Sequence, residues 1–426
     1  MNCVKRYTCC DVLSSSSRRN IFLMTWFKFS TICRFNASFI SLIYGAICIG
    51  LTIGWPEDFL IHIIATCPNE VSIDVEKLRS TTRLVTNMGG CLGALIPPCF
   101  VDVIGRRRHF AITAILDIIC WLTLTLVKNS PILFIGAASG GMATGSFVVT
   151  ATMYIGELSP ALSRGRSTPL VALFVYIGIL IGRILSLFIY NRIAPFTMSM
   201  VTLGFLVSVY YWMIESPYYL YEQGEILKAK ESLKKLRVNY NILDIESEYK
   251  SMEIFFDAED ESIRQHAYFL SSAFMINSGK SSTGVILVLL IVSQTIGGYA
   301  MSEYTERFIH KFLPYYEKSI LTFFDVLSVA IYSFVHETKY LTISGYTDEI
   351  FTSIIVILYC IANSLGLTPI LPLLTGDVFP NRIKTIAAGL CISVIYLGAM
   401  INQIVFELLD AHRVWYTIKF KIQWMI

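Results

Sequence analysis

The chain alternates between long apolar segments and short polar connections. Residues 131–156 carry no formal charge, and residues 109–127 carry only Asp117. A helix needs roughly 20 predominantly apolar residues to cross the hydrocarbon core of a bilayer. The pattern therefore predicts an all-α transmembrane helix bundle, because helices satisfy their own backbone polar groups in lipid. The spans are expected at 37–55, 83–101, 109–127, 131–153, 168–190, 195–214, 284–302, 319–335, 350–374 and 386–409.

A polar stretch, 215–283, separates the first six of these segments from the rest. Within it, Ala229, Leu233 and Leu236 share one helical face opposite charged residues. A solvated linker would not need this periodicity, which favours a short intracellular helical subdomain. We expect four parts, which are a cytoplasmic segment 1–36, a six-helix half 37–214, the intracellular helical loop 215–283 and an incomplete C-terminal half 284–426.

Composition agrees with a membrane protein. The chain has 426 residues, of which 54% are hydrophobic and 15% charged, whereas soluble domains average about 45–50% and about 25%. A net charge of +3 gives no reason to expect nucleic-acid binding. Lys and Arg concentrate before residue 36 and in 215–283, so the positive-inside rule predicts a cytoplasmic N-terminus in a multi-pass plasma-membrane protein. The sequence has neither a metal-ligand spacing nor a nucleophile elbow, so we expect no cofactor, no metal and no enzymatic chemistry.

One cassette of an acid, a proline and a base occurs twice, each time where an apolar segment ends. The copies are Glu157, Pro160 and Arg164, and Asp377, Pro380 and Lys384. A repeat of this kind across two hydrophobic halves indicates a duplicated membrane carrier. Lys384 cannot make the two-pronged carboxylate contact available to an arginine, so the second copy should hold its partner more weakly.

A second charged motif follows the second predicted span. Asp102 precedes Gly105, and three arginines come next. Glycine lets the backbones of adjacent helices approach in a short turn. Asp102 can pair with a base on the neighbouring bundle and hold one end of a carrier shut. The alternative is that the arginines only enforce topology; the accompanying acid favours the first interpretation.

Five short motifs occur in an order that resembles a known family. They are Gly93 with Asp102-Val103-Ile104-Gly105-Arg106-Arg107, Tyr154 with Glu157, Pro160, Arg164 and Gly165, Glu215-Ser216-Pro217, Gly366 with Pro369, and Phe379-Pro380. The first resembles the signature loop of the major facilitator superfamily. Together they are similar to the sugar porter family, most of all to insect facilitated trehalose transporter-like proteins, over residues 39–409.

The resemblance implies alternating access, in which two six-helix halves rock about a sugar site at the bilayer midplane. It also implies a cytoplasmic cluster of gating charges that closes in the outward-facing state. Its expected members are Asp102, Arg106, Arg107, Glu157, Arg164, Glu215, Asp377 and Lys384.

The implied sugar site keeps only part of the family pattern. Gln294 stands at one of two paired glutamine positions, Tyr299 replaces an asparagine, and Ala172 replaces a glutamine. Asn363 and Ser364 lie about one turn before Gly366 and can restore polarity. We expect Gln294, Tyr299, Asn363 and Ser364 to bind the substrate, because each sugar hydroxyl must exchange its hydrogen bonds to water.

The second half is shorter than the resemblance requires. Only 38 residues separate Lys339 from Asp377, and sixteen residues interrupted by Lys419 and Lys421 follow Asp410. We therefore expect about ten of the usual twelve spans, with the ninth and twelfth missing, as in an incomplete gene model or a splice variant.

Two functions fit these observations. The first is facilitative transport of a hexose or a trehalose-like disaccharide; the second is a non-transporting paralogue acting as a sensor, or a degenerate or truncated product. The span 37–55 has no carboxylate, which favours uniport. Asp117 and Asp325 are either proton-relay groups, carboxylates satisfied by a partner, or carboxylates that reach toward the membrane interface. The expected partners are a small sugar and the lipid bilayer, with no obligate protein partner.

Overall fold

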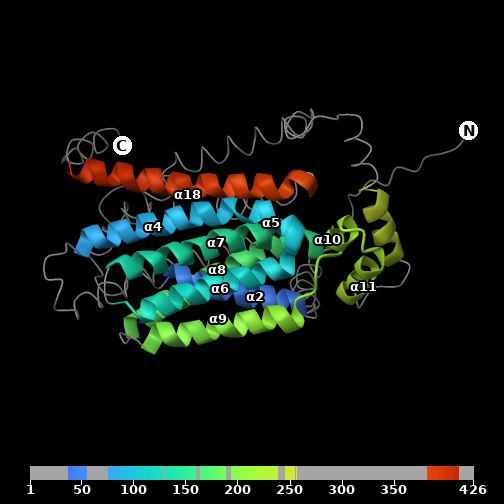
Figure 1. Ribbon diagram of the computed structural model, residues 1–426, viewed down its shortest axis with the longest axis horizontal. Helices are drawn as coiled ribbons and strands as arrows, with labels where there is room; N and C mark the ends of the chain where they lie inside the picture. The colour runs from blue at the N-terminus through green and yellow to red at the C-terminus, as the bar shows by residue number, and fades with distance from the viewer. Residues whose placement is uncertain are drawn as a thin grey trace, which may run out of the picture.

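The described part of the chain is a bundle of long α-helices with a small helical appendage at one end (Figure 1). The computed structural model describes residues 37–54, 75–127, 130–159, 164–188, 193–237, 245–254, 256 and 381–411. Its helices are α2 (Ala37–Gly54), α4 (Val75–Leu95), α5 (Pro97–Ile104), α6 (Arg106–Thr125), α7 (Ser130–Leu158), α8 (Arg164–Phe188), α9 (Ile193–Trp212), α10 (Pro217–Glu222), α11 (Ile226–Leu236) and α18 (Asn381–Ala411). Residues 245–254 are also helical.

The apolar pattern predicted most of the long helices within a few residues. Among the described residues, α2, α6, α7, α9 and the stretch Thr385–Val405 of α18 are long and apolar enough to cross a membrane, and α8 contains the shorter apolar stretch Pro169–Leu185. The all-α transmembrane class is therefore confirmed. The predicted spans 284–302, 319–335 and 350–374 lie outside the described residues.

The second predicted span, 83–101, is wrong at both ends. α4 begins at Val75, because two polar turns that we assigned to a connection are helical. It ends at Leu95, and after Ile96 the chain starts α5 with Pro97 at its first position. Proline lacks the N–H that would continue the hydrogen-bond ladder, so the apolar stretch forms two helices instead of one.

Small residues set the closest helix packing in the bundle. A Cβ on Gly141 of α7 would lie 2.1 Å from the carbonyl oxygen of Thr86 on α4, and one on Gly145 would lie 2.1 Å from that of Gly90. Any larger residue would push α4 and α7 apart. Close approach at small residues is how helices gain packing energy in lipid, where hydrophobic burial between them gives little.

An aromatic cluster fills the core between α6, α7 and α9 near the end of the bundle that carries α10, which we call the α10 end. Phe110 lies edge-on to Phe147 and to Tyr154, with ring centroids 5.5 Å apart in both pairs. The hydroxyl of Tyr154 donates to the carbonyl oxygen of Ile214, just beyond α9. The hydroxyl of Ser38 also accepts the backbone N–H of Ile214, at 2.9 Å. These contacts fix the start of the connection that leads to α10.

α18, from the second half of the sequence, runs alongside α4 and also contacts α5 and α7 (Figure 1). Ala388 and Ile392 pack against Val149 and Met153 of α7 in one buried cluster. At the end opposite α10, the Gln403 amide donates to the carbonyl oxygen of Ser80 at 2.7 Å. α18 is therefore joined to the first half along most of its length.

Candidate functional site

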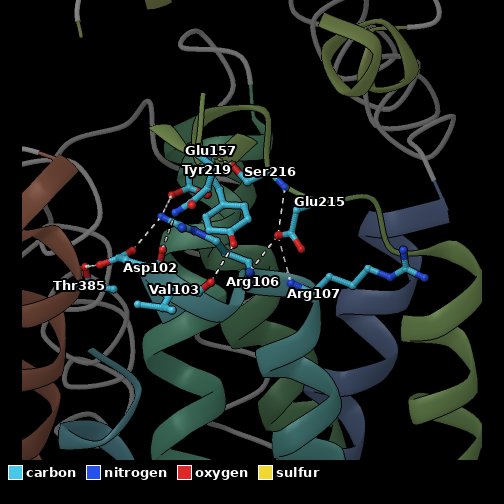
Figure 2. Close-up of polar contacts among 10 residues, drawn as sticks. Asp102, Val103, Arg106, Arg107, Glu157, Glu215, Ser216, Tyr219 and Thr385 are labelled. Atoms are coloured by element: carbon cyan, nitrogen blue, oxygen red, sulfur yellow. Dashed lines mark hydrogen bonds and ion pairs between the residues drawn. The ribbon is translucent and has the colours of Figure 1, made fainter. Parts of the chain in front are cut away.

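A buried arginine, Arg106, joins three helices at the α10 end. Its side chain is 4% exposed, and its Nη2 lies 3.0 Å from Oε1 of Glu157 on α7 and 3.2 Å from Oδ1 of Asp102 on α5. Glu157 is itself 5% exposed. Figure 2 shows the two carboxylates converging on the guanidinium. One base thus compensates two acids that come from other helices.

Gly105 makes this geometry possible. It separates α5 from α6 with φ of +96°, in the region that favours glycine. A Cβ at this position would lie 2.8 Å from Oε2 of Glu215. The turn therefore needs glycine both for its backbone angle and for the carboxylate beside it.

Glu215 binds the first turn of α6. Its Oε1 accepts the backbone N–H of Arg106 at 2.8 Å and that of Arg107 at 3.2 Å. The N–H groups of a first helical turn have no partner within the helix, and the helix dipole favours an anion there. Burial raises the pKa of the Glu215 carboxyl, and these N–H bonds with the Arg106 charge oppose that shift.

α10 covers the cluster from the outside. The Tyr219 ring lies over Arg106, with Cζ 5.1 Å from the ring centroid, and its hydroxyl donates to the carbonyl oxygen of Val103 at 3.0 Å (Figure 2). The Gln223 amide donates to the carbonyl oxygen of Asp102 at 3.0 Å. A planar guanidinium stacked on an aromatic ring gains cation–π attraction in addition to its ion pairs.

A hydroxyl from α18 completes the cluster. Thr385 Oγ1 donates to Asp102 Oδ2 at 2.6 Å, so Asp102 is shared between Arg106 in the first half and Thr385 in the second (Figure 2). Burial raises the pKa of Asp102, opposed by the Arg106 charge and by the Thr385 hydrogen bond. We call Asp102, Arg106, Glu157, Glu215, Tyr219 and Thr385 the Arg106 cluster.

The Arg106 cluster is not fully satisfied. Among the described residues, Nε and Nη1 of Arg106 and Oε2 of Glu157 are buried without a hydrogen-bond partner. Each buried unsatisfied polar atom costs about 1–3 kcal/mol. This arrangement is therefore less favourable than its two short ion pairs alone suggest.

A second buried arginine ties the appendage to the bundle. Arg237 is 2% exposed, and its guanidinium contacts both carboxylate oxygens of Glu248, at 2.7 and 2.9 Å. Its Nη1 also donates to the carbonyl oxygen of Leu158, at the end of α7, at 2.8 Å. Arg237 was not among the residues expected from the sequence; its signal there is an arginine directly after an amphipathic run.

The predicted gating residues are only partly brought together. Asp102, Arg106, Glu157 and Glu215 meet in the cluster. The Arg107 side chain points away from it (Figure 2), and its Nε donates to the carbonyl oxygen of Val209 at 3.2 Å, at the end of α9. Arg164 begins α8 and Lys384 lies in the first turn of α18, but their side chains are outside the described residues, as is all of Asp377.

The predicted substrate residues Gln294, Tyr299, Asn363 and Ser364 also lie outside the described residues, as does Asp325. Asp117 lies within them and is buried in α6. Its two carboxylate oxygens accept hydroxyl hydrogen bonds from Thr52 at 2.6 Å and Thr202 at 3.0 Å. This matches the alternative of a carboxylate satisfied by its partners. In the described ranges no three His, Cys, Asp or Glu side chains group closely enough to hold a metal ion.

The chain is similar in sequence to known proteins. The family model described as "Sugar (and other) transporter" matches residues 57–335. The chain is 30% identical to Sugar transporter ERD6-like 6 of Arabidopsis thaliana, over 36% of this chain and 31% of that one. It is 23% identical to Facilitated trehalose transporter Tret1 of Apis mellifera ligustica, over 76% and 69%. Probable polyol transporter 3 of Arabidopsis thaliana matches over 44% of its length. The chain therefore spans less than half the length of two of these three relatives.

The fold has close counterparts among solved structures. The proton:xylose symporter XylE from E. coli matches with a TM-score of 0.63 at 15% identity, over 89% of this chain and 90% of that one. That structure is described as a major facilitator superfamily protein. The chain belongs to the sugar transporter family and has the major facilitator fold.

Proposed function

We propose that this protein is a facilitative carrier that moves a hexose or a trehalose-like disaccharide by alternating access, with the Arg106 cluster as the lock on its cytoplasmic end. The observation that carries the proposal is the shared carboxylate of Asp102. It contacts Arg106 at 3.2 Å and Thr385 at 2.6 Å, so it connects helices from opposite halves of the sequence. The relatives, which include a trehalose transporter, support a sugar as the substrate.

Opening of the lock would replace contacts within the protein by contacts with water. When α18 and α5 separate, Asp102 loses Thr385, and water can reach Arg106. The buried atoms of Arg106 and Glu157 that lack partners would then be hydrated, which offsets part of the lost ion-pair energy. A carrier needs this balance, because a sugar can shift the two states only by its difference in affinity for them.

The Glu215 contact belongs to the part of the lock that does not move. Its carboxylate stays on the N–H groups of α6, within the first half, whether or not α18 moves. The Tyr219 hydroxyl and the Gln223 amide likewise donate to carbonyl oxygens of α5, within the first half. The moving contact is therefore Asp102 with Thr385, and the remaining residues hold Asp102 and Arg106 in position for it.

The finer assignments belong to the same proposal. The α10 end faces the cytoplasm in the plasma membrane, because bases concentrate there and before residue 36. Gln294, Tyr299, Asn363 and Ser364 bind the sugar. Transport is uniport, since α2 contains no acidic residue.

A non-transporting sensor is the second candidate. The observation that favours it is Ala172 on α8, which packs against Leu170 and Leu173 where the resemblance calls for a sugar-binding amide. A site that has lost polar groups can bind a sugar too weakly to move it.

Uptake by purified protein in liposomes distinguishes the two. The proposal expects glucose or trehalose exchange that is driven by sugar alone and is unaffected by a proton ionophore. If folded protein binds either sugar but exchanges neither, the carrier proposal is wrong and the sensor takes its place. Exchange abolished by the ionophore would overturn uniport only.

A further inference from the structure

A cavity of about 940 Å³ opens on the outer surface between α6, α9 and the α10–α11 appendage. In Figure 1 the appendage stands beyond the ends of α6 and α9 that border this cavity. Ala111, Leu206 and Val207 form its apolar wall, on the helices that would cross the bilayer. Arg108 and Lys228 lie on its polar side. The cavity is thus apolar toward the bundle centre and basic toward its end.

The charges in this cavity are unevenly satisfied. Arg107 also lines it, but donates to the carbonyl oxygen of Val209. Glu215 accepts N–H groups of α6, and Lys228 contacts Glu225 at 2.8 Å on an exposed surface. For Arg108, by contrast, the described residues provide neither a hydrogen bond nor an ion pair. Two acids therefore line the cavity, and both are already engaged.

Arg108 is also poorly placed for helix stability. It lies in the first turn of α6, where the helix dipole disfavours a cation. Glu215 already accepts the Arg106 and Arg107 N–H groups of this turn, so the Arg108 guanidinium is the group that a bound anion would meet. The position therefore calls for an anionic ligand.

Aromatic residues place the cavity at the level of lipid headgroups. Tyr210 and Tyr211 line it and are 68% and 73% exposed, and Trp212 beside them is 53% exposed. Tyr and Trp are enriched where a bilayer meets water. Val207 on the wall is 49% exposed, as expected of a helix surface that faces acyl chains.

We propose that this cavity binds the phosphate of an anionic phospholipid through Arg108 and Lys228, with the acyl chains lying against α6 and α9. Basic pockets beside membrane helices bind such headgroups. Lys228 would exchange Glu225 for the phosphate and so link α11 to α6. The leaflet depends on the proposed orientation; the binding itself does not depend on transport.

The test measures lipid retained by the purified full chain. Native mass spectrometry after exchange into phosphatidylglycerol or phosphatidylcholine should show selective retention of phosphatidylglycerol by the wild-type protein. Arg108→Gln should weaken retention about fivefold, and Arg108→Gln with Lys228→Gln further, since each base near an anionic surface contributes a factor of that size. Lys234→Gln removes a base from α11 outside the cavity lining and should change nothing.

Two further readouts keep the test decisive if a variant is unstable. Phosphatidylglycerol should slow hydrogen exchange in α11 of the wild-type protein, and inorganic phosphate at matched concentration should not. If inorganic phosphate slows hydrogen exchange equally, the ligand is a free anion and the proposal of a bound phospholipid is wrong. If Arg108→Gln and Lys234→Gln lose phosphatidylglycerol equally, the lipid is held by the general positive charge of this end, and the proposed site in the cavity is wrong.

Discussion

Replacing Arg106 by Gln should open the α10 end, because it leaves Glu157 as a buried charge without its base. Glu157 is 5% exposed and its only short ion-pair contact among the described residues is Arg106, at 3.0 Å. Removing one partner of a buried ion pair costs roughly 3–5 kcal/mol. At about 1.36 kcal/mol for each factor of ten, the closed population should fall roughly 150- to 5,000-fold relative to the open one.

Thiol labelling at Ala388 measures this shift. Ala388 is fully buried in the cluster that α18 forms with α4, α5 and α7, and becomes accessible only if α18 separates from them. An Ala388→Cys reporter, read by peptide-resolved mass spectrometry so that native thiols do not interfere, should label slowly in the otherwise unchanged chain. Adding Arg106→Gln should speed its labelling strongly, while sugar uptake falls and surface expression persists.

A double variant separates the buried-charge argument from general loosening. Glu157→Gln in addition to Arg106→Gln removes the more deeply buried of the two carboxylates left without a base, the other being Asp102, which is 35% exposed, so labelling should return part of the way toward that of the reporter alone. Lys234→Gln, which removes an exposed base, is the control. Slow labelling in folded Arg106→Gln would refute the lock, and fast labelling that persists in the double variant would refute its electrostatic origin.

Four other outcomes follow from the same contacts. Gly105→Ala should lower thermal stability by about 1–2 kcal/mol or more, since it strains a positive φ and meets Glu215; a Tm equal to wild type would contradict this. Arg237→Ala should speed hydrogen exchange in α10 and α11 without speeding thiol labelling of the Ala388→Cys reporter; unchanged exchange would count against its anchoring role. Gln294→Ala should weaken sugar binding roughly five- to 150-fold, checked by calorimetry, and equal affinity would place the sugar elsewhere. Burial raises the pKa of Asp102 above 3.8 in the closed form, and separation of α18 would hydrate this carboxyl, so closing takes up a proton between 3.8 and the raised value, and acid should favour the closed state in labelling, not the open one.

The long helices could be predicted because their signal is local. Apolar length alone located α2, α6, α7, α8, α9 and α18 within a few residues. It failed at α4, where Pro97 interrupts an otherwise continuous apolar stretch and where polar turns before residue 83 are helical. In those polar turns Leu78 packs in a buried cluster with Trp121 and Leu133, and the carbonyl oxygen of Ser80 accepts the Gln403 amide; hydropathy does not measure such contacts.

The site was predicted in part, and among the gating residues whose side chains the structure describes, the misplaced one, Arg107, has a simple geometric cause. Successive residues on a helix point about 100° apart, so Arg106 and Arg107 cannot both face the same cluster. Arg106 faces inward and Arg107 reaches the end of α9. This exclusion was available from the sequence. The roles of Thr385 and Gln223 could not be predicted from the sequence. A hydroxyl and an amide carry no charge pattern, and their roles depend on how distant segments meet.

The composition of the Arg106 cluster suits a lock that must open. A cluster with every polar atom paired would be costly to break, whereas here the buried Nε and Nη1 of Arg106 and Oε2 of Glu157 gain water on opening. The link to the second half is a single neutral donor, Thr385, on a carboxylate that is 35% exposed. Such a bond is worth about 1–3 kcal/mol. That is within what the differential binding of a sugar can supply, so the same contact can hold the resting state closed and still yield during transport.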